Sequence, residues 1–268
     1  MSVITLVTDF GTRDWFVGAM KGAMLRIAPR VTIVDINHEV PAGNIAAGAF
    51  ALAASYSYFP KGTVHVIVVD PGVGSSRKAL AIETTNYIFV GPDNGVLSLA
   101  LRREKITAIH SLENRNYHAE QVSRTFHGRD VFAPVAAYLA QGTAIAKLGR
   151  RLNKLVMLKW PEMRKEGAVV KGEIVYFDQF GNAITNINEA AFTTATEKSW
   201  EVYISHGRRC KLEQFYQIVR TGQPLGIIGS TGFLEIAVNG GSAKRVLNLK
   251  IGTVVTVRPS RKAGSLKR

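Results

Sequence analysis

The stretch VITLVTDFGTRDWFVGAMKGAMLRIAPRVTIVDI, residues 3–36, decides the fold. Its two ends, residues 3–8 and 31–36, are short apolar, β-branched runs of the kind that is buried in a parallel sheet. Between them, residues 15–27 place apolar side chains at helical spacing and stop before Pro29. The stretch therefore predicts a strand, a helix and a second strand parallel to the first.

The segments that follow continue this alternation. Their pattern predicts a helix, three strands and a helix, at residues 45–58, 63–69, 79–83, 87–90 and 131–140. Alternating strands and helices with right-handed crossovers form layered α/β folds. We therefore expect residues 1–160 to form an N-terminal three-layer α/β domain with a mostly parallel sheet.

The pattern changes after Gly142. Residues 143–167 combine charged clusters with Pro161 and are typical of a connector. The segments beyond it predict short strands separated by turns, at residues 172–177, 183–187, 200–205, 225–229, 233–238 and 253–257. We expect residues 161–268 to form a smaller C-terminal β domain that is barrel-like or a sandwich.

The chain is strongly basic. Its 34 Lys and Arg residues exceed its 20 Asp and Glu residues by 14, a balance that attracts polyanions such as nucleic acid. The basic residues are spread along the chain, and their densest run is the C-terminal tail, residues 258–268, which we expect to be frayed. No aromatic-basic stripe accompanies them, so the sequence favours a basic solvated surface over a nucleic-acid-binding module.

Other features of the composition concern the compartment. Cys210 is the only cysteine, which excludes an internal disulfide and is typical of a reducing cytoplasm. No apolar run approaches the roughly 18 residues of a membrane span. The N-terminus has neither a basic region before its apolar stretch nor a small-residue cleavage site, so it predicts a strand rather than a signal peptide. We expect a cytoplasmic protein without a membrane segment.

Two strand ends carry an aspartate and a glycine-containing turn. Asp9 follows the first strand and Asp70 follows the third. Either one alone would be ordinary turn chemistry, but ligands bind beyond the carboxyl ends of strands in open α/β sheets, so the pair indicates a site. The Gly-Val-Gly of residues 72–74 lacks dinucleotide spacing and no phosphate-binding loop occurs, so a nucleoside without phosphates fits best. Asp9 is then placed to accept hydrogen bonds from the ribose hydroxyls.

Other polar positions are ambiguous when they are taken singly. His127 and Asp130 precede a predicted helix, where they would be a surface histidine and a helix N-cap. His38 follows a strand end, where lining a pocket and capping a turn fit the sequence equally. Residues 177–182 and 229–241 end strands with polar side chains and glycines, as ordinary turns do. No metal-ligand cluster and no nucleophile elbow occurs, so we expect neither a catalytic metal nor a serine hydrolase.

Taken together, six ordered motifs resemble one family, the S-adenosyl-L-methionine (SAM) hydroxide adenosyltransferases or SAM hydrolases, relatives of the SAM-dependent fluorinase and chlorinase. The motifs are TDFG at residues 8–11, DPGVG at 70–74, GPDNG at 91–95, FHGRD at 126–130, DQFGNAITNI at 178–187 and NGGSA at 239–243. They cover almost the whole chain. Any one of them is weak, but six in this order at family-like spacing are a specific signal.

The resemblance implies a homotrimer that binds SAM between subunits and forms adenosine and L-methionine without a cofactor. It implies a catalytic Asp-Arg-His set, which falls here on Asp70, Arg77 and His127. The substrate contacts that it implies are Asp9 for the ribose, Asp178 and Ser230 for the methionine end with Glu235 as a further contact to the amine, and Asn182 with the backbone near Asn239 and Gly240 for the adenine side.

The chemistry of SAM cleavage agrees with these residues. Attack at C5′ expels a neutral thioether from a sulfonium, so the leaving group needs no acid, and holding and activating one water is the main task. Asp70 could accept the proton of that water, whereas the Arg77 cation would orient Asp70 and make it a weaker base. His127 could polarise the water or relay its proton. The sequence leaves open which of the three takes the proton.

Two other functions remain as alternatives. A halogenase desolvates a halide in an apolar pocket; the halogenases carry Tyr-Pro where this chain has Asp70-Pro71, and an insertion for which the short turn at residues 84–86 leaves no room. The Asp70 carboxylate would repel a halide and welcome water, while Gly128 does not discriminate. A non-catalytic nucleoside- or nucleic-acid-binding protein has only the basic charge in its favour.

Overall fold

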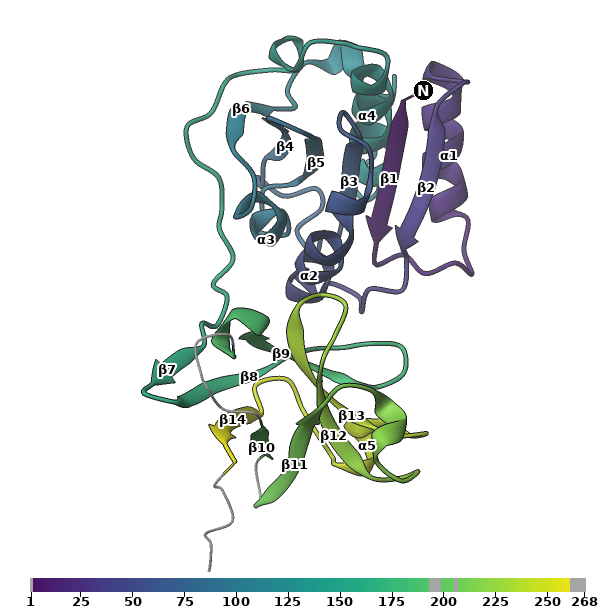
Figure 1. Ribbon diagram of the computed structural model, residues 1–268. Coiled ribbons are helices and arrows are strands. Elements are labelled where there is room, and N and C mark those ends of the chain that lie inside the picture. The colour runs from purple at the N-terminus through teal and green to yellow at the C-terminus, as the bar shows by residue number, and fades with distance from the viewer. Residues whose placement is uncertain (1, 193–198, 205–206, 261–268) are drawn as a thin grey trace, which may run out of the picture. The chain divides into compact units, whose positions relative to one another are not determined.

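The computed structural model describes residues 2–192, 199–204 and 207–260. These residues belong to two compact units, Met1–Lys159 and Trp160–Arg268, each with its own sheet and its own buried core (Figure 1). Each unit is described by itself below.

The first unit is built on a six-stranded sheet with the order β2-β1-β3-β5-β4-β6. The strands are β1 (Val3–Thr8), β2 (Thr32–Asn37), β3 (Val64–Val68), β4 (Ala79–Thr84), β5 (Ile88–Pro92) and β6 (Ile106–Ser111). Neighbours among β2, β1, β3 and β5 pair in parallel, whereas β4 pairs antiparallel with both β5 and β6. The mostly parallel sheet expected from the sequence is confirmed.

Helices cover both faces of this sheet. On one face, α1 (Phe16–Ile27) and α4 (Ala133–Ala140) pack on each other and share a core with Leu6 of β1 and Val66 of β3. On the other, α2 (Ile45–Ser55) packs on α3 (Ser98–Leu101), and its Gly48 lies against Ile67 and Val69. Because side chains alternate along a strand, neighbouring residues of β3 serve opposite layers. The three-layer arrangement follows (Figure 1).

Local sequence sets where the helices begin and end. α1 ends at Ile27, just before Pro29, which cannot continue a helix. α2 begins after Asn44, whose side chain accepts a hydrogen bond from the backbone N of Ala47 at 3.0 Å. The helix expected at residues 45–58 is α-helical only to Ser55 and then tightens into the 3₁₀ turn Tyr56–Tyr58.

The pairing of β1 with β2 is irregular at its carboxyl end. Leu6 pairs with Asp35, but the next residue, Val7, pairs with Asn37 and skips Ile36. The partner strand therefore accommodates one extra residue, which changes what lies beside the end of β1.

The second unit is a closed β-barrel with one extra strand. Its strands are β7 (Arg164–Glu166), β8 (Val169–Phe177), β9 (Ala183–Asn188), β10 (Trp200–Ile204), β11 (Arg208–Glu213), β12 (Pro224–Ile228), β13 (Phe233–Val238) and β14 (Val254–Pro259). Seven of them follow the order β14-β10-β11-β12-β13-β9-β8, and β8 pairs with β14 to close the ring, while β7 pairs with β8 alone. The structure thus decides for a barrel and against a sandwich.

Several elements did not follow from the sequence pattern. β6 and β11 were not expected, and β11 reads RRCKLE, in which charged residues hide the alternation of a strand. The helix expected at residues 131–140 is preceded by a π-helical turn, Gly128–Phe132, so Asp130 lies inside a turn and is not an N-cap. The strand expected at residues 200–205 corresponds to β10. Residue 205, the last of the expected strand, lies outside the described residues.

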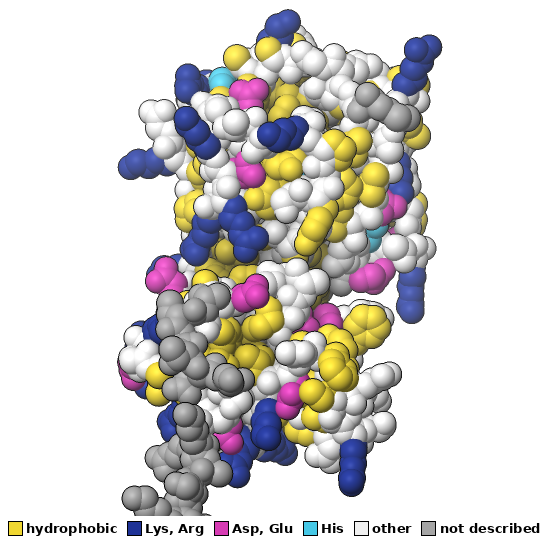
Figure 2. Space-filling model, in the orientation of Figure 1, with side chains coloured by type: hydrophobic (Ala, Val, Ile, Leu, Met, Phe, Trp, Pro, Cys, Tyr) yellow, Lys and Arg dark blue, Asp and Glu magenta, His cyan; other side chains and the backbone are white. Residues whose placement is uncertain are grey.

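The basic side chains form no single stripe on the face drawn in Figure 2, where Lys and Arg are scattered. Of the basic tail expected to be frayed, Arg258 belongs to β14 and places its guanidinium 5.3 Å from the ring centroid of Tyr203, which corrects the expectation there. Residues 261–268 lie outside the described residues. Among the helices that the structure describes, none is long and apolar enough to cross a membrane.

Candidate active site

The loop after β3 brings Asp70 and Arg77 together. A hydrogen bond from Val73 N to Asp70 O, 3.1 Å long, closes its first turn. Gly74 follows with a φ of 79°, and a Cβ there would lie 2.4 Å from the carbonyl oxygen of Arg124, so only glycine fits. The chain then returns toward the end of β3 and points the Arg77 guanidinium at the Asp70 carboxylate.

Arg77 and Asp70 form a nearly buried ion pair. Nε of Arg77 lies 3.0 and 2.9 Å from the two carboxylate oxygens, and Nη2 also donates to Oδ2. Only 10% of the arginine side chain and 4% of the aspartate side chain are exposed. The guanidinium also lies over the ring of Phe132, 5.4 Å from its centroid. Because several contacts hold each group, the orientation of the carboxylate is fixed.

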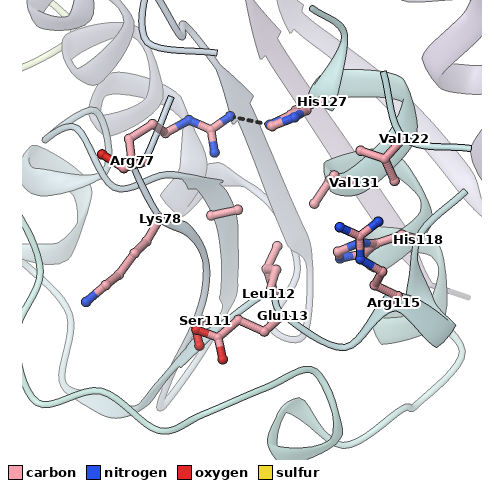
Figure 3. Close-up of a pocket in the computed structure, with 12 residues that line it drawn as sticks. Arg77, Lys78, Ser111, Leu112, Glu113, Arg115, His118, Val122, His127 and Val131 are labelled. Atoms are coloured by element: carbon pink, nitrogen blue, oxygen red, sulfur yellow. Dashed lines mark hydrogen bonds between the residues drawn. The ribbon is translucent and has the colours of Figure 1, made fainter. Parts of the chain in front are cut away.

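His127 completes this set. Its Nδ1 lies 2.8 Å from Nη2 of Arg77 (Figure 3). A guanidinium has donors only, so Nδ1 must accept and the proton of the neutral ring sits on Nε2. Burial, followed by the nearby Arg77 cation, lowers the pKa of His127 below its ordinary value, although Asp70 and Asp130 act in the opposite direction. The imidazole is therefore a neutral donor at Nε2 near pH 7.

Asp130 holds the turn that presents His127. It is almost fully buried, accepts a hydrogen bond from the backbone N of Ser123 at 2.8 Å and pairs with Arg129 at 2.6 Å. Its own carbonyl accepts from the backbone N of Ala119. Asp130 thus ties the π-helical turn to the preceding loop.

A cavity of about 380 Å³ opens beside this set and is lined by Asp9, Asp70 and His127 among others. Asp9 follows β1, and its Oδ2 accepts a 2.7 Å hydrogen bond from the backbone N of Gly43. Burial raises the pKa of Asp9, and the charge of Asp70 adds to this rise, while the hydrogen bond from Gly43 opposes it. The two carboxylates that the sequence placed at strand ends therefore do share one cavity, because β1 and β3 are neighbours in the sheet.

Aromatic rings form the apolar wall of this cavity. Phe10, Phe16 and Phe126 contact one another with centroid separations of 5.1 to 5.8 Å. A Cβ on Gly128 would lie 3.2 Å from Phe10, Phe126 and Met20, so the wall leaves little space for a side chain there. An apolar wall facing carboxylates suits a ligand with both a flat ring and hydroxyl groups.

A second cavity, of about 410 Å³, also reaches Arg77 and His127 (Figure 3). It is lined in addition by Arg115 and His118, which sequence reasoning did not single out because neither has polar neighbours in a recognisable motif. Burial, the Arg115 cation and His127 together lower the pKa of His118. His127 therefore lines both cavities, whereas Arg77 lines the second one.

The second unit brings together three of the residues expected to bind substrate. At the turn between β8 and β9, Asn182 donates to both oxygens of Asp178, through its backbone N and its Nδ2, each at 2.8 Å. Glu235 of β13 is buried, and burial raises its pKa with further help from the charge of Asp178, while Tyr216 acts against this rise. Tyr216, which the sequence did not single out, is thus a further polar group near both acids.

The remaining predicted residues flank β13. Ser230 follows Gly229, where a Cβ would lie 1.7 Å from Oε1 of Glu235, so glycine makes room for that acid. At the other end of β13, Asn239 donates from Nδ2 to the carbonyl of Val219 at 2.8 Å, and Gly240 adopts a φ of 68°. The side chain of Asn239 is thus engaged with the main chain, and its backbone N and O are engaged as well, with Gln223 O and Gly222 N.

Comparison with known proteins decides the family. Residues 4–149 match the SAM hydroxide adenosyltransferase N-terminal domain and residues 172–256 match the SAM hydroxide adenosyltransferase C-terminal domain. The chain belongs to the SAM hydroxide adenosyltransferase family. The first of these domains alone spans more than half of its length, and the resemblance of the six motifs is confirmed.

Individual proteins are similar to this chain over almost its full length. A protein from Thermus thermophilus named (R)-S-adenosyl-L-methionine hydrolase is 36% identical, over 95% of this chain and 99% of that protein. A fluorinase from an Actinoplanes species is more distant, with 27% identity over 95% and 97%. The crystal structure of an uncharacterized conserved protein from Thermotoga maritima superposes with a TM-score of 0.88 at 37% identity, covering 96% of this chain and all of that one.

Within residues 2–192, 199–204 and 207–260, no group of three or more His, Cys, Asp or Glu side chains is arranged to hold a metal ion. The polar groups of the site instead pair with one another in two places, Asp70 with Arg77 and His127, and Asp178 with Asn182.

We expect His127 to titrate below pH 6.5, since burial and Arg77 both disfavour its charged form. Replacing Arg77 by Met removes the cation and leaves Asp70 unpaired, so the midpoint should move upward. NMR titration of the imidazole signals in both proteins measures this. A midpoint that stays in place or falls in Arg77→Met would contradict the assigned contact.

Proposed function

We propose that this chain hydrolyses SAM to adenosine and L-methionine by in-line attack of water at C5′. The observation that carries the proposal is the Asp70–Arg77–His127 set at the edge of a cavity that also holds Asp9. Relatives named SAM hydrolase at 36–37% identity over nearly the whole chain support the same activity.

The reaction forms one O–C5′ bond and breaks the C5′–S bond, whose electron pair leaves with sulfur as the neutral thioether of methionine. One proton of the attacking water must be removed. The sulfonium needs no acid, so the enzyme contributes mainly by holding one water in line and accepting its proton.

Asp70 is the group that accepts this proton in our proposal. Nδ1 of His127 is occupied by Arg77, and its Nε2 already carries a hydrogen, so the neutral ring offers no free lone pair. His127 instead donates to the water oxygen and orients it. Arg77 positions both partners, and its charge keeps the site from repelling the electron-rich nucleophile.

The ribose, adenine and methionine contacts are assigned by the same logic. Asp9 keeps acceptor capacity beyond its bond from Gly43 and would receive the ribose hydroxyls. Asn182 gives both donors named above to Asp178, which leaves its Oδ1 for the adenine amino group. Backbone groups near Asn239 and Gly240 would complete the adenine side.

The methionine ammonium fits the acidic pair of the second unit. Burial raises the pKa of Glu235, and the like charge of Asp178 adds to this rise. A bound ammonium would relieve this repulsion, with Ser230 as a further hydrogen-bonding group for the methionine end.

Halide attack is the weaker alternative. A halide needs an apolar site with few charges. The position at which the halogenases carry tyrosine holds the Asp70 carboxylate here, in an ion pair with Arg77. The fluorinase relative is also the more distant one.

We propose further that the two sets of residues act in one site shared between subunits of a homotrimer, since each unit alone carries only part of the ligand set. We also propose a cytoplasmic location, supported by a single, buried cysteine, Cys210. On the face drawn in Figure 2 the basic residues are scattered, which gives no support to a nucleic-acid partner there.

Incubation with SAM should release adenosine and methionine in equal amounts, and added chloride or fluoride should yield no halogenated nucleoside. Liquid chromatography of the products measures both. Turnover should survive EDTA, because we assign no step to a metal. Loss of activity in EDTA that one added metal restores would show that a metal takes part.

Replacing Asp70 by Asn should leave SAM affinity near normal but lower kcat by about 10²–10⁴-fold, since the amide cannot accept the proton. Replacing Asp9 by Asn should instead raise the Kd and KM for SAM by about tenfold or more with kcat little changed, because its ribose contacts are equal in ground and transition states. Calorimetry and steady-state kinetics separate the two. Near-normal turnover in Asp70→Asn would rule out the proposed base.

Sedimentation should show three chains per particle. A mixture of Asp70→Asn and Asp178→Ala proteins, unfolded and refolded together, should regain activity, since some shared sites then contain both native residues. Each variant refolded alone is the control. A monomer with full activity, or a mixture no more active than its parts, would exclude a shared site.

A further inference from the structure

A chain of polar contacts runs from the surface of the first unit to the loop after β1. Lys21 Nζ lies 2.5 Å from Asp35 Oδ2, and Asp35 Oδ1 lies 3.0 Å from Nε2 of His38. On the other side of the ring, Nδ1 of His38 is 2.8 Å from Oγ1 of Thr8. Thr8 Oγ1 in turn accepts a 3.3 Å hydrogen bond from the backbone N of Phe10.

The direction of every proton in this chain is set at its outer end. Burial raises the pKa of Asp35, but the hydrogen bond from Lys21 and the nearby His38 ring outweigh it and hold the pKa below its ordinary value. The ionised Asp35 carboxylate favours the tautomer of His38 that carries its proton on Nε2. Nε2 and the carboxylate oxygen are close, but they do not have hydrogen-bond geometry, so the interaction is electrostatic. Nδ1 then accepts from the hydroxyl of Thr8, and that oxygen has a lone pair left for Phe10 N.

His38 also holds the same loop through its backbone. Its carbonyl oxygen accepts a 2.8 Å hydrogen bond from the backbone N of Gly11. Asp9 thus lies between two points held by one residue, Thr8 before it and Gly11 after it. A third hold, from Gly43 N to the Asp9 carboxylate, comes from the same segment between β2 and α2.

The Thr8, His38 and Asp35 side chains resemble a nucleophilic triad in order, but they are not placed for that chemistry. Thr8 is fully buried and His38 is 5% exposed. Neither lines the cavity that holds Asp9 and Asp70. A hydroxyl that no substrate can reach is not a nucleophile. What remains is the effect of the chain on the shape of the loop.

The geometry points to His38 as a positioning residue for substrate binding: together with Asp35 and Thr8 it orients the Asp9 carboxylate toward the cavity. The inference rests on the proposed function, in which Asp9 receives the ribose of SAM. It predicts that weakening the chain lowers affinity for the nucleoside and leaves the chemical step intact.

The same strand offers a matched control. Thr5 of β1 is also fully buried, and its Oγ1 lies 2.7 Å from Nδ1 of a second buried histidine, His65. His65 is packed among aromatic rings, including those of Tyr56 and Phe89, and burial lowers its pKa to about 3. Neither Thr5 nor His65 lines the Asp9 cavity. The two Thr–His pairs therefore have the same chemistry, but only the Thr8–His38 pair contacts the loop that carries Asp9.

The experiment compares Thr8→Val with Thr5→Val, both of which remove one buried hydroxyl with little change of shape. Both variants should lose a similar amount of thermal stability. Only Thr8→Val should raise the KM for SAM, by about two- to tenfold, the range that corresponds to the net loss of one hydrogen bond. Its kcat should stay within about twofold of the wild type.

Two variants of the histidine separate its contacts. In His38→Asn the side-chain oxygen falls near the place of Nδ1 and can still accept from Thr8, whereas in His38→Gln the amide reaches toward Asp35 and loses Thr8. We expect the KM for SAM to rise more in His38→Gln than in His38→Asn. Hydrogen exchange at the Gly11 and Gly43 amides should speed up in the same order, and not in Thr5→Val.

The outcomes distinguish the two proposals. Wild-type protein that does not turn over SAM refutes the proposed function, and the exchange rates still test whether His38 fixes the loop. If the wild type hydrolyses SAM but Thr8→Val raises KM no more than Thr5→Val, His38 has no positioning role. Unchanged exchange at Gly11 and Gly43 in His38→Gln would refute that role as well.

Discussion

Parallel pairing of β1, β2 and β3 is the constraint on which the candidate site depends. Parallel neighbours end at the same edge of a sheet, so the loops after these three strands must lie together. The first loop carries Asp9, the second supplies Gly43 to hold it, and the third carries Asp70. Two carboxylates thus share one cavity: burial raises the pKa of Asp9, and the charge of Asp70 adds to this rise.

Arg77 resolves part of that conflict. Its positive charge compensates the negative charge of Asp70 in a nearly buried ion pair. Its contact with Nδ1 also fixes the tautomer of His127. A carboxylate and an imidazole placed together without it would compete for one proton and sample several arrangements. With it, each has one arrangement: the carboxylate is paired with the guanidinium, and the imidazole keeps its hydrogen on Nε2.

Much of this could be read from the sequence, and the part that could not has physical reasons. The apolar runs around Asp9 and Asp70 are strong signals because both strands are buried on two faces. β11 gave no such signal, since its exposed positions are Arg and Lys. Asp178, Asn182 and Glu235 do meet, but Tyr216 lies beside them in a 3₁₀ turn without a motif.

His38 shows the same limit at a single residue. From sequence, lining a pocket and capping a turn were equally compatible, because what decides between them is a contact across 30 positions to Thr8. A hydrogen bond to a residue that far away leaves no local pattern. Local propensity locates strands and turns, whereas the partners of buried polar groups are set by topology.

The irregular pairing between β1 and β2 has a consequence for which lengths of chain the fold accepts. In regular register Thr8 would lie beside Asn37; the skipped Ile36 advances the partner by one position, so that His38 follows directly on the pair Val7–Asn37. If the two strands kept the regular register instead, Asn37 would lie beside Thr8 and His38 would lie one position further along. The extra residue in β2 is therefore what brings the imidazole level with the Thr8 hydroxyl that it contacts. The length of β2 relative to β1 matters here alongside the identity of its residues.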